Sequence, residues 1–280
     1  MRFNKGQAGL SIVELLVALV ISMLLMTGVV QVFLASKQTY ASNEAASRLQ
    51  ENGRFALEFI AQSARHAGYV EAANITVDPL PRPIIPPSVG NNCDAGLCST
   101  QGTAANQNAS DSVSFSFQPR VLEGARRDCL GKTSGISAND IIINNFYIAY
   151  EGAGNASLAC ASRNVSQNTN ISIKPGPEPE QSHEANILVE GIDALQVQYG
   201  IATTGNVSRY VSADRLSEQD WNNVVAVRIA VLANSIDRVS PPPPAERQYV
   251  LLDAAPLSFT DGKARQVFTS TIKLRNTGEP

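Results

Sequence analysis

Residues 9–36 read GLSIVELLVALVISMLLMTGVVQVFLAS, and this stretch decides the fold. From Leu15 to Ser36 it holds 22 residues without a charge. As a helix this run would be roughly 33 Å long, the thickness of one bilayer core. The short tail before it carries the basic residues Arg2 and Lys5. Because positive residues stay on the cytoplasmic side, we expect the rest of the chain to be exported.

A cleaved secretory signal peptide is the competing interpretation of this segment. Its apolar region would be shorter and would end at a small-residue cleavage site. The observed run is longer than that, and Phe33, Leu34 and Ala35 fit such a site poorly. The pattern therefore favours an anchor that stays attached to the protein.

Glu14 does not fit an ordinary membrane anchor. It lies four residues into the apolar segment that begins at Leu10. A carboxylate there costs on the order of 1–3 kcal/mol of insertion free energy, depending on its depth. Either Glu14 reaches the membrane interface or it has a partner, and the surrounding residues favour a partner. A carboxylate in the first turn also suits the positive end of the helix dipole.

The sequence GLSIVE at residues 9–14, after a basic leader and before an apolar helix, resembles the leader of type IV prepilins. The resemblance implies that a membrane peptidase cuts between Gly9 and Leu10 and methylates the new amino terminus at Leu10. Leu10 stands where this family usually has phenylalanine. Glu14 would become the fifth residue of the mature chain. The resemblance implies that it pairs with the terminal amine of a neighbouring subunit during assembly.

The helix is expected to continue past the membrane to about His66. Residues 37–66 contain no proline, and small or apolar residues recur there at helical spacing. A helix from Leu10 to His66 would be roughly 85 Å long. Phe55 and Phe59 form a second i,i+4 pair. We expect this pair and the stripe to pack against a sheet. The stripe consists of Leu49, Gly53, Ala56, Ile60, Ala64 and Ala67.

The remainder of the chain has the pattern of β-structure. Residues 78–92 are too rich in proline for a helix or central strand, and residues 99–112 are small and polar like a loop. Strands are predicted at 112–117, 140–150, 195–201, 221–233 and 265–275. Because no helices alternate with these strands, the pattern predicts an antiparallel sheet covered by the N-terminal helix. The fold class expected is therefore α+β.

Four further segments resemble PilW-type minor pilins. They are GRFALEFI at 53–60 with AGY at 67–69, the strands GIDALQVQYG at 191–200 and WNNVVAVRI at 221–229, and the ending VFTSTIKLRN at 267–276. The J pseudopilin of type II secretion is built alike and is the nearest competing family. Both resemblances imply a minor subunit near the tip of a filament.

Four cysteines, Cys93, Cys98, Cys129 and Cys160, would lie in the exported part. Thiols normally pair in an oxidising periplasm, and four cysteines allow three connectivities. We favour Cys93–Cys98, which closes a tight loop, and Cys129–Cys160, which ties a long one. A zinc site is the alternative, but the spacing is unusual and no histidine lies nearby in the sequence.

Other functional classes receive little support. A net charge of -3 over 280 residues argues against binding to nucleic acid, and two histidines exclude a His-rich metal site. Asp214, Glu218 and Asp220 could suit calcium, yet no calcium-loop pattern surrounds them, which favours a solvated short helix. A membrane-anchored periplasmic enzyme is the lowest-ranked alternative, because no motif joins a nucleophile to a base. We expect no cofactor.

The expected organisation has four parts: a prepilin leader (1–9), a membrane-spanning or filament-core helix (10–36), the amphipathic half of that helix (37–70) and a β-rich periplasmic head (71–280). The resemblance implies a non-enzymatic minor pilin in a priming complex for type IV pili, supporting twitching motility and adhesion. The expected partners are other minor pilins, the major pilin, a tip adhesin, the prepilin peptidase and the inner membrane. The protein would move from the inner membrane to the pilus tip.

Overall fold

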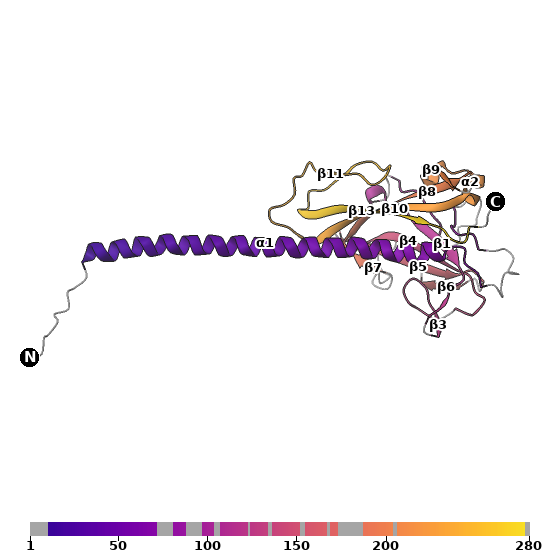
Figure 1. The fold of residues 1–280 in the computed structure, drawn as a ribbon, viewed down its shortest axis with the longest axis horizontal. Helices are drawn as coiled ribbons and strands as arrows, with labels where there is room; N and C mark the ends of the chain where they lie inside the picture. The colour runs from indigo at the N-terminus through magenta and orange to yellow at the C-terminus, as the bar shows by residue number, and fades with distance from the viewer. Residues whose placement is uncertain are drawn as a thin grey trace, which may run out of the picture. The chain divides into compact units, whose positions relative to one another are not determined.

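The structure of the protein is a computed structural model. It describes residues 11–71, 81–87, 97–103, 107–122, 124–133, 136–151, 155–166, 169–172, 187–203 and 206–277. The chain divides into two structural units, residues 1–44 and residues 45–280. One helix, α1 (Ile12–His66), contributes residues to both units (Figure 1).

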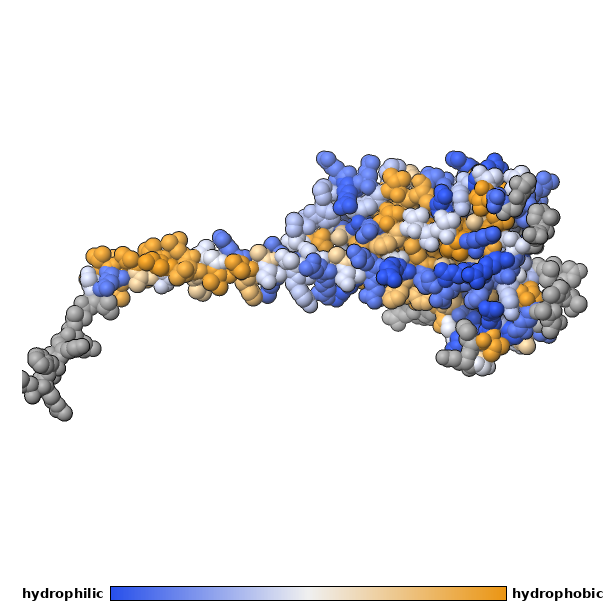
Figure 2. Space-filling view, in the orientation of Figure 1, coloured by the Kyte–Doolittle hydropathy of each residue, from blue (hydrophilic) through white to orange (hydrophobic). Residues whose placement is uncertain are grey.

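Within the first unit, α1 presents an almost continuous apolar surface (Figure 2). Its large hydrophobic side chains are exposed; Leu24 and Met26, for example, are 69% and 70% exposed. By length and composition this helix could cross a membrane. The hydroxyl groups of Ser22 and Thr27 donate to main-chain carbonyls one turn earlier, at 2.7 and 2.8 Å. These polar side chains are therefore satisfied inside the helix itself.

Helix α1 ends where the chain turns sharply. His66 is its last residue, and Gly68 has a φ of +74°, a left-handed conformation that favours glycine. The Gly68 N–H donates to the carbonyl of Ser116 at 2.8 Å. The Asn276 side chain donates to the carbonyl of Ala67 at 3.0 Å, which ties the end of the chain to the end of the helix.

The second unit contains two larger antiparallel sheets. One has the order β1-β4-β5-β6 with β7 also paired to β5, and the other has the order β13-β10-β8-β9. The first comprises β1 (Val113–Phe117), β4 (Ile142–Glu151), β5 (Asn155–Asn164), β6 (Thr169–Ser172) and β7 (Ile187–Glu190). The second comprises β8 (Ile192–Ala202), β9 (Val207–Val211), β10 (Val224–Arg238) and β13 (Lys263–Lys273).

Shorter elements fill the connections. They are the hairpin of β2 (Val121–Leu122) and β3 (Ala125–Arg126), the pair β11 (Gln248–Tyr249) and β12 (Leu257–Ser258), the helix α2 (Glu218–Asn222), and the 3-10 turns Gln107–Ala109 and Ala213–Arg215. The α+β class and the packing of the long helix on antiparallel sheets, both predicted from the sequence, are confirmed.

The main hydrophobic core lies between α1 and both sheets. The predicted stripe of α1 faces it: Leu49 is 4% exposed, Ala56, Ile60, Ala64 and Ala67 are fully buried, and Gly53 is buried. The glycine at position 53 lets α1 approach Phe268 of β13 closely. A Cβ atom built there would lie 2.3 Å from Cδ2 of Phe268 on β13, far inside van der Waals distance. The stripe of small residues therefore lets the helix approach the sheet closely.

Phe55 and Phe59 are not in this core, contrary to expectation. They are 51% and 36% exposed. Their spacing from one another is helical, but they lie on a face of α1 that the sheets do not cover. The narrow stripe of small residues is buried, and the two larger rings beside it remain at the surface. The prediction of core packing for this pair is wrong.

The strand predictions hold with two changes. Residues 221–233 were expected to form one strand, but Trp221 lies in α2 and the strand begins at Val224. The side chain of Ser217 caps α2 by accepting the N–H of Asp220, and the Asp220 carboxylate accepts the N–H of Ser217. This capping box starts a helical turn where apolar composition alone indicated a strand. The ring of Trp221 then packs edge-on against Tyr199, with centroids 4.7 Å apart.

The second change concerns the extent of the sheets. Strands β5, β6, β7 and β9 lie outside the five predicted strand regions. In addition, β1 is buried on both faces, not only on the face of Val113, Phe115 and Phe117. Ser114 on the other face donates its hydroxyl to the carbonyl of Leu97 at 2.9 Å. Leu97 covers this face together with Tyr147 and Ala159 in a second, smaller core.

Candidate functional site

The predicted processing site lies at the edge of the described residues. Gly9 and Leu10 lie outside them, so cleavage and methylation there stay predictions. Ser11 precedes α1, and its hydroxyl accepts the N–H of Val13 at 3.3 Å, as a helix-capping residue does. Glu14 lies in the first turn of α1, and its side chain is exposed. Its carboxylate is therefore free to meet a group from outside the chain, next to the positive end of the helix.

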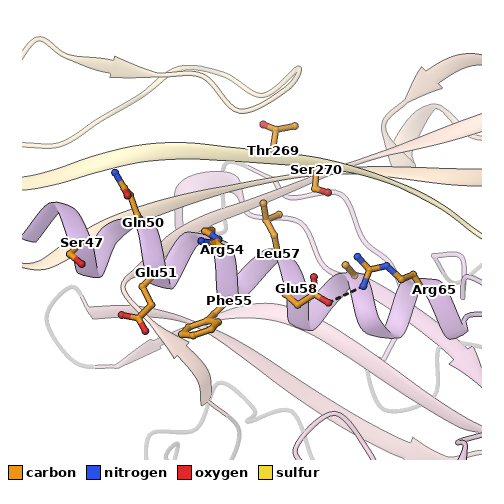
Figure 3. A pocket seen from close by; sticks show the side chains of 11 residues that line it. Ser47, Gln50, Glu51, Arg54, Phe55, Leu57, Glu58, Arg65, Thr269 and Ser270 are labelled. Carbon is orange, nitrogen blue, oxygen red and sulfur yellow. Dashed lines mark hydrogen bonds and ion pairs between the residues drawn. The ribbon is translucent and has the colours of Figure 1, made fainter.

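The solvent-facing side of α1 in the second unit borders a groove of about 810 Å³ (Figure 3). Thr269 and Ser270 of β13 form its other wall. Leu57 points toward β13, whereas Phe55 points away from it (Figure 3). β13 pairs with β10 on one side only and is an edge strand of its sheet. An edge strand, and an exposed aromatic ring on the side of α1 turned away from that strand, are both suited to protein contact.

The charges along this groove are only partly paired. Glu58 accepts a hydrogen bond from Arg65 at 2.9 Å, and this bond lowers the pKa of the Glu58 carboxyl. Arg54 is exposed and forms no ion pair with any described residue. Because exposed ion pairs contribute little to stability, these charges are available to a partner.

His66 is the last residue of α1. Burial lowers the pKa of its imidazole, and the positive charges of Arg120, Arg275 and Arg65 lower it further. The ring is therefore neutral near pH 7.

Cys129 and Cys160 form a disulfide, with Cα atoms 6.4 Å apart, as the sequence analysis favoured. It joins the loop after β3 to the middle of β5. Cys98 is buried and disulfide-bonded. Its expected partner, Cys93, lies outside the described residues, so the Cys93–Cys98 pairing stays a prediction. Across the described ranges, no group of His, Cys, Asp and Glu side chains could hold a metal ion.

The acidic residues considered for calcium serve local structure. Asp214 lies in a 3-10 turn and accepts the hydroxyl of Ser212 at 2.5 Å. Asp220 belongs to the capping box of α2 and faces Arg209 at 3.6 Å. Glu218 is exposed in the first turn of α2. The segment forms short helical turns, as the favoured interpretation predicted.

A buried ion pair and the hydrogen bond beside it join three strands, and no motif in the sequence pointed to them. Arg265 of β13 donates through Nε to Asp193 of β8, and both side chains are almost fully buried. Asn234 of β10 donates to the same Asp193 carboxylate at 2.8 Å. A second carboxylate, Asp261, binds the end of the guanidinium, which lowers the pKa of Asp261 to about 2. This network fixes the register of β8, β10 and β13.

Asp111 is a second buried carboxylate that the sequence did not reveal. Its side chain is 3% exposed and accepts main-chain N–H groups from Gly102 and Val197, both at 2.7 Å. Its own N–H donates to the carbonyl of Leu195 at 2.8 Å. Burial raises the pKa of this carboxyl to about 7, against the two hydrogen bonds. Asp111 thus fastens the loop before β1 to strand β8.

Comparisons with known proteins show that two parts of this chain are similar to known families. Residues 145–276 match the family model "Type IV Pilus-assembly protein W", and residues 4–30 match the "Prokaryotic N-terminal methylation motif". No curated protein matches the sequence. A type IV-like pilin from Thermus thermophilus has a similar solved structure, at 14% identity and a TM-score of 0.42, covering 83% of this chain and 100% of its own. At so low a score the assignment rests on the two sequence matches.

The PilW match covers strands β5 to β10 and all of β13. The match to the methylation motif covers Glu14 and much of the exposed apolar part of α1. An N-terminal methylation motif, a long apolar helix packed on antiparallel sheets and a PilW match over residues 145–276 together support a PilW-type minor pilin.

Proposed function

We propose that this protein is a minor pilin that helps to initiate type IV pilus assembly within a priming complex at the filament tip. It acts as a structural subunit, not as an enzyme, and supports twitching motility and adhesion. The observation that carries the proposal is Glu14: an exposed carboxylate in the first turn of α1, directly before the uncharged run from Leu15 to Ser36. Such a group is costly in a membrane unless it finds a partner.

In this proposal the helix is first stored in the inner membrane with the β-rich unit in the periplasm. The prepilin peptidase removes residues 1–9 and methylates Leu10. Glu14 then pairs with the terminal amine of a neighbouring subunit, so that two charges enter the filament core together. The groove lined by Phe55 and by Arg54, which has no ion-pair partner among the described residues, offers a second surface to other minor pilins, the major pilin or a tip adhesin.

The test is a strain whose only copy of the gene carries Glu14→Ala. Membrane insertion should be unchanged or improved, because the substitution removes a charge from an apolar helix. Mass spectrometry should still find a mature chain that starts at methylated Leu10. Cross-linking to the other minor pilins and the number of pili should fall, since an unpaired amine in the filament core costs about 3–5 kcal/mol. Glu14→Asp, which keeps the charge, is the matched control and should retain part of the assembly.

Normal cross-linking and normal piliation with Glu14→Ala would show that Glu14 is only a tolerated surface carboxylate. Recovery of an intact Met1 terminus would contradict the leader assignment. A deletion strain that keeps its pili but loses type II secretion would assign the chain to a secretion pseudopilus instead.

A further inference from the structure

Strand β13 leaves one of its two edges unpaired in the described part of the chain. β10 is the only strand there that pairs with it, and the register runs unbroken from Arg265 to Lys273. In an antiparallel pair, successive residues point their main-chain groups alternately toward the partner strand and away from it. The N–H of Leu274 donates to the carbonyl of Val225 on β10 at 2.9 Å, which fixes this alternation. The residues whose N–H and C=O groups point away from β10 are Val267, Thr269, Thr271 and Lys273.

This outer edge lacks the sequence features that usually block pairing with another strand. Residues 266–272 read QVFTSTI, without a charge, a proline or a glycine. The 11 residues of β13 are about twice the usual length of a strand, and Thr269 and Thr271 are exposed. A long, regular and uncharged edge is a template to which a further strand can add.

The groove beside α1 has room for the side chains of such a strand. It has a volume of about 810 Å³ and lies between α1 and the part of β13 that carries Thr269 and Ser270. Ser270 points toward α1 and Thr269 points away from it (Figure 3). An added strand would lie roughly 4.8 Å from β13, and every second side chain would project on the α1 side, over Leu57 and Ala61. A helix could not pair with the edge, because its own main-chain groups are bonded within it. The edge therefore selects an extended segment.

The charges along the edge are unevenly distributed. Lys273 and Arg275, at its C-terminal end, are both exposed. Arg275 lies close enough to His66 for its positive charge to lower the pKa of the imidazole, as do Arg120 and Arg65. Basic groups therefore gather where β13 ends, whereas the middle of the strand is uncharged. A partner segment that carries a carboxylate at this end matches the edge in charge.

A second copy of this chain does not match the edge. If two β13 strands paired antiparallel about Thr269, Lys263 of one copy would lie opposite Arg275 of the other. In a parallel pair in register, the two Lys273 residues would lie side by side. Like charges directly opposite one another on paired strands are destabilising. The charges therefore favour a different chain as the partner.

We propose that the outer edge of β13 accepts an extended segment of a neighbouring pilin subunit as an additional strand. The segment is uncharged where it pairs with Val267, Thr269 and Thr271, and it carries a carboxylate beside Lys273 and Arg275. This inference rests on the assembly role proposed above, which supplies the neighbouring subunit.

The experiment places the photoreactive residue benzoylphenylalanine at Thr269 or at Thr271 of the full-length chain, in a piliated strain without another copy of the gene. After irradiation, peptide mass spectrometry identifies the residues that are joined. Both positions should cross-link to one segment of another pilin subunit. Moving the probe from Thr269 to Thr271 should move the cross-link by about two residues on that segment, because paired strands advance together.

Thr269→Pro, with the probe at Thr271, tests the main-chain pairing. The N–H of Thr269 points away from β10, so proline there removes a donor only from the outer edge. We expect the cross-link yield to fall about tenfold and the urea midpoint of the purified protein to stay unchanged. Thr269→Val keeps the N–H and the size of the side chain, and this matched control should cross-link normally. If proline lowers the urea midpoint, Thr269→Lys replaces it, because a charge on the edge also opposes pairing.

Three results would overturn the proposal: no cross-link to another pilin subunit, a cross-link to a second copy of this chain, or equal yields with Thr269→Pro (or its Lys replacement) and Thr269→Val. Loss of pili in the Glu14→Ala strain, together with unchanged cross-linking in Thr269→Pro, would reject strand addition and leave the assembly role standing. Normal pili in the Glu14→Ala strain would count against the assembly role by itself.

Discussion

Replacing Gly53 by alanine tests how closely α1 packs on β13. At an open position in a helix this change stabilises a protein by about 1 kcal/mol, because alanine has the higher helix propensity. At Gly53 the new Cβ atom would lie 2.3, 2.4 and 2.8 Å from three ring atoms of Phe268. Overpacking of this kind costs about 1–3 kcal/mol. We therefore expect Gly53→Ala to lower the free energy of unfolding by up to about 2 kcal/mol, the overpacking cost less the gain in helix propensity.

The same substitution in a Phe268→Ala background should have the opposite sign. With the ring removed, only the helix propensity remains, and Gly53→Ala should stabilise by about 1 kcal/mol relative to Phe268→Ala alone. Urea unfolding of the full chain in detergent can be followed by the fluorescence of Trp221, the one tryptophan in the chain, which packs on Tyr199. If Gly53→Ala stabilises both backgrounds equally, the close contact does not exist in solution.

Two further predictions use the same unfolding measurement. Replacing Cys129 and Cys160 by alanine should lower the free energy of unfolding by about 3–4 kcal/mol. This is the loop-entropy value for a disulfide that joins residues 31 positions apart. An unchanged urea midpoint would contradict this prediction. The second concerns Asp111, whose pKa is about 7 in the folded protein and 3.8 ordinarily. Between those values the folded state holds a proton that the unfolded state has lost, so stability should fall as pH rises from about 4 to about 7. Asp111→Asn should remove that part of the slope, and identical slopes for both proteins would show that Asp111 does not titrate as described.

The sequence predicted the long helix and its buried stripe because both follow from periodicity. The stripe of Leu49, Gly53 and Ile60 repeats at helical spacing, and only one face of a helix can meet a sheet. The exposure of Phe55 could not be predicted, because spacing gives the angle between residues but not the width of the covered face. That width depends on how small the stripe residues are.

The missed strands have a different cause. β5 reads NASLACASRN, and its alanines and serines carry neither the β-branched nor the aromatic pattern of a strand. It is buried because β4, β6 and β7 pair with it, a long-range effect. The buried network around Asp193 was missed for the same reason. Asp193, Asn234 and Arg265 come from three strands and share no sequence spacing, so only the fold brings them together.

The last strand, β13, and the residues after it supply contacts that the packing of α1 requires. β13 supplies Phe268 against Gly53 and Arg265 to the buried Asp193, and Asn276 then binds the carbonyl at the end of α1. Contacts between residues so far apart in sequence form slowly. The entropy of closing a long loop is lost before the contacts contribute any favourable free energy. During synthesis the small-residue stripe of α1 therefore stays exposed until β13 has been made and can pack against it. A chain truncated before Lys263 would keep the predicted leader and α1. Its small-residue stripe would be uncovered, and Asp193 would lack its ion-pair partner Arg265. We therefore expect such fragments to be degraded before they can join a filament.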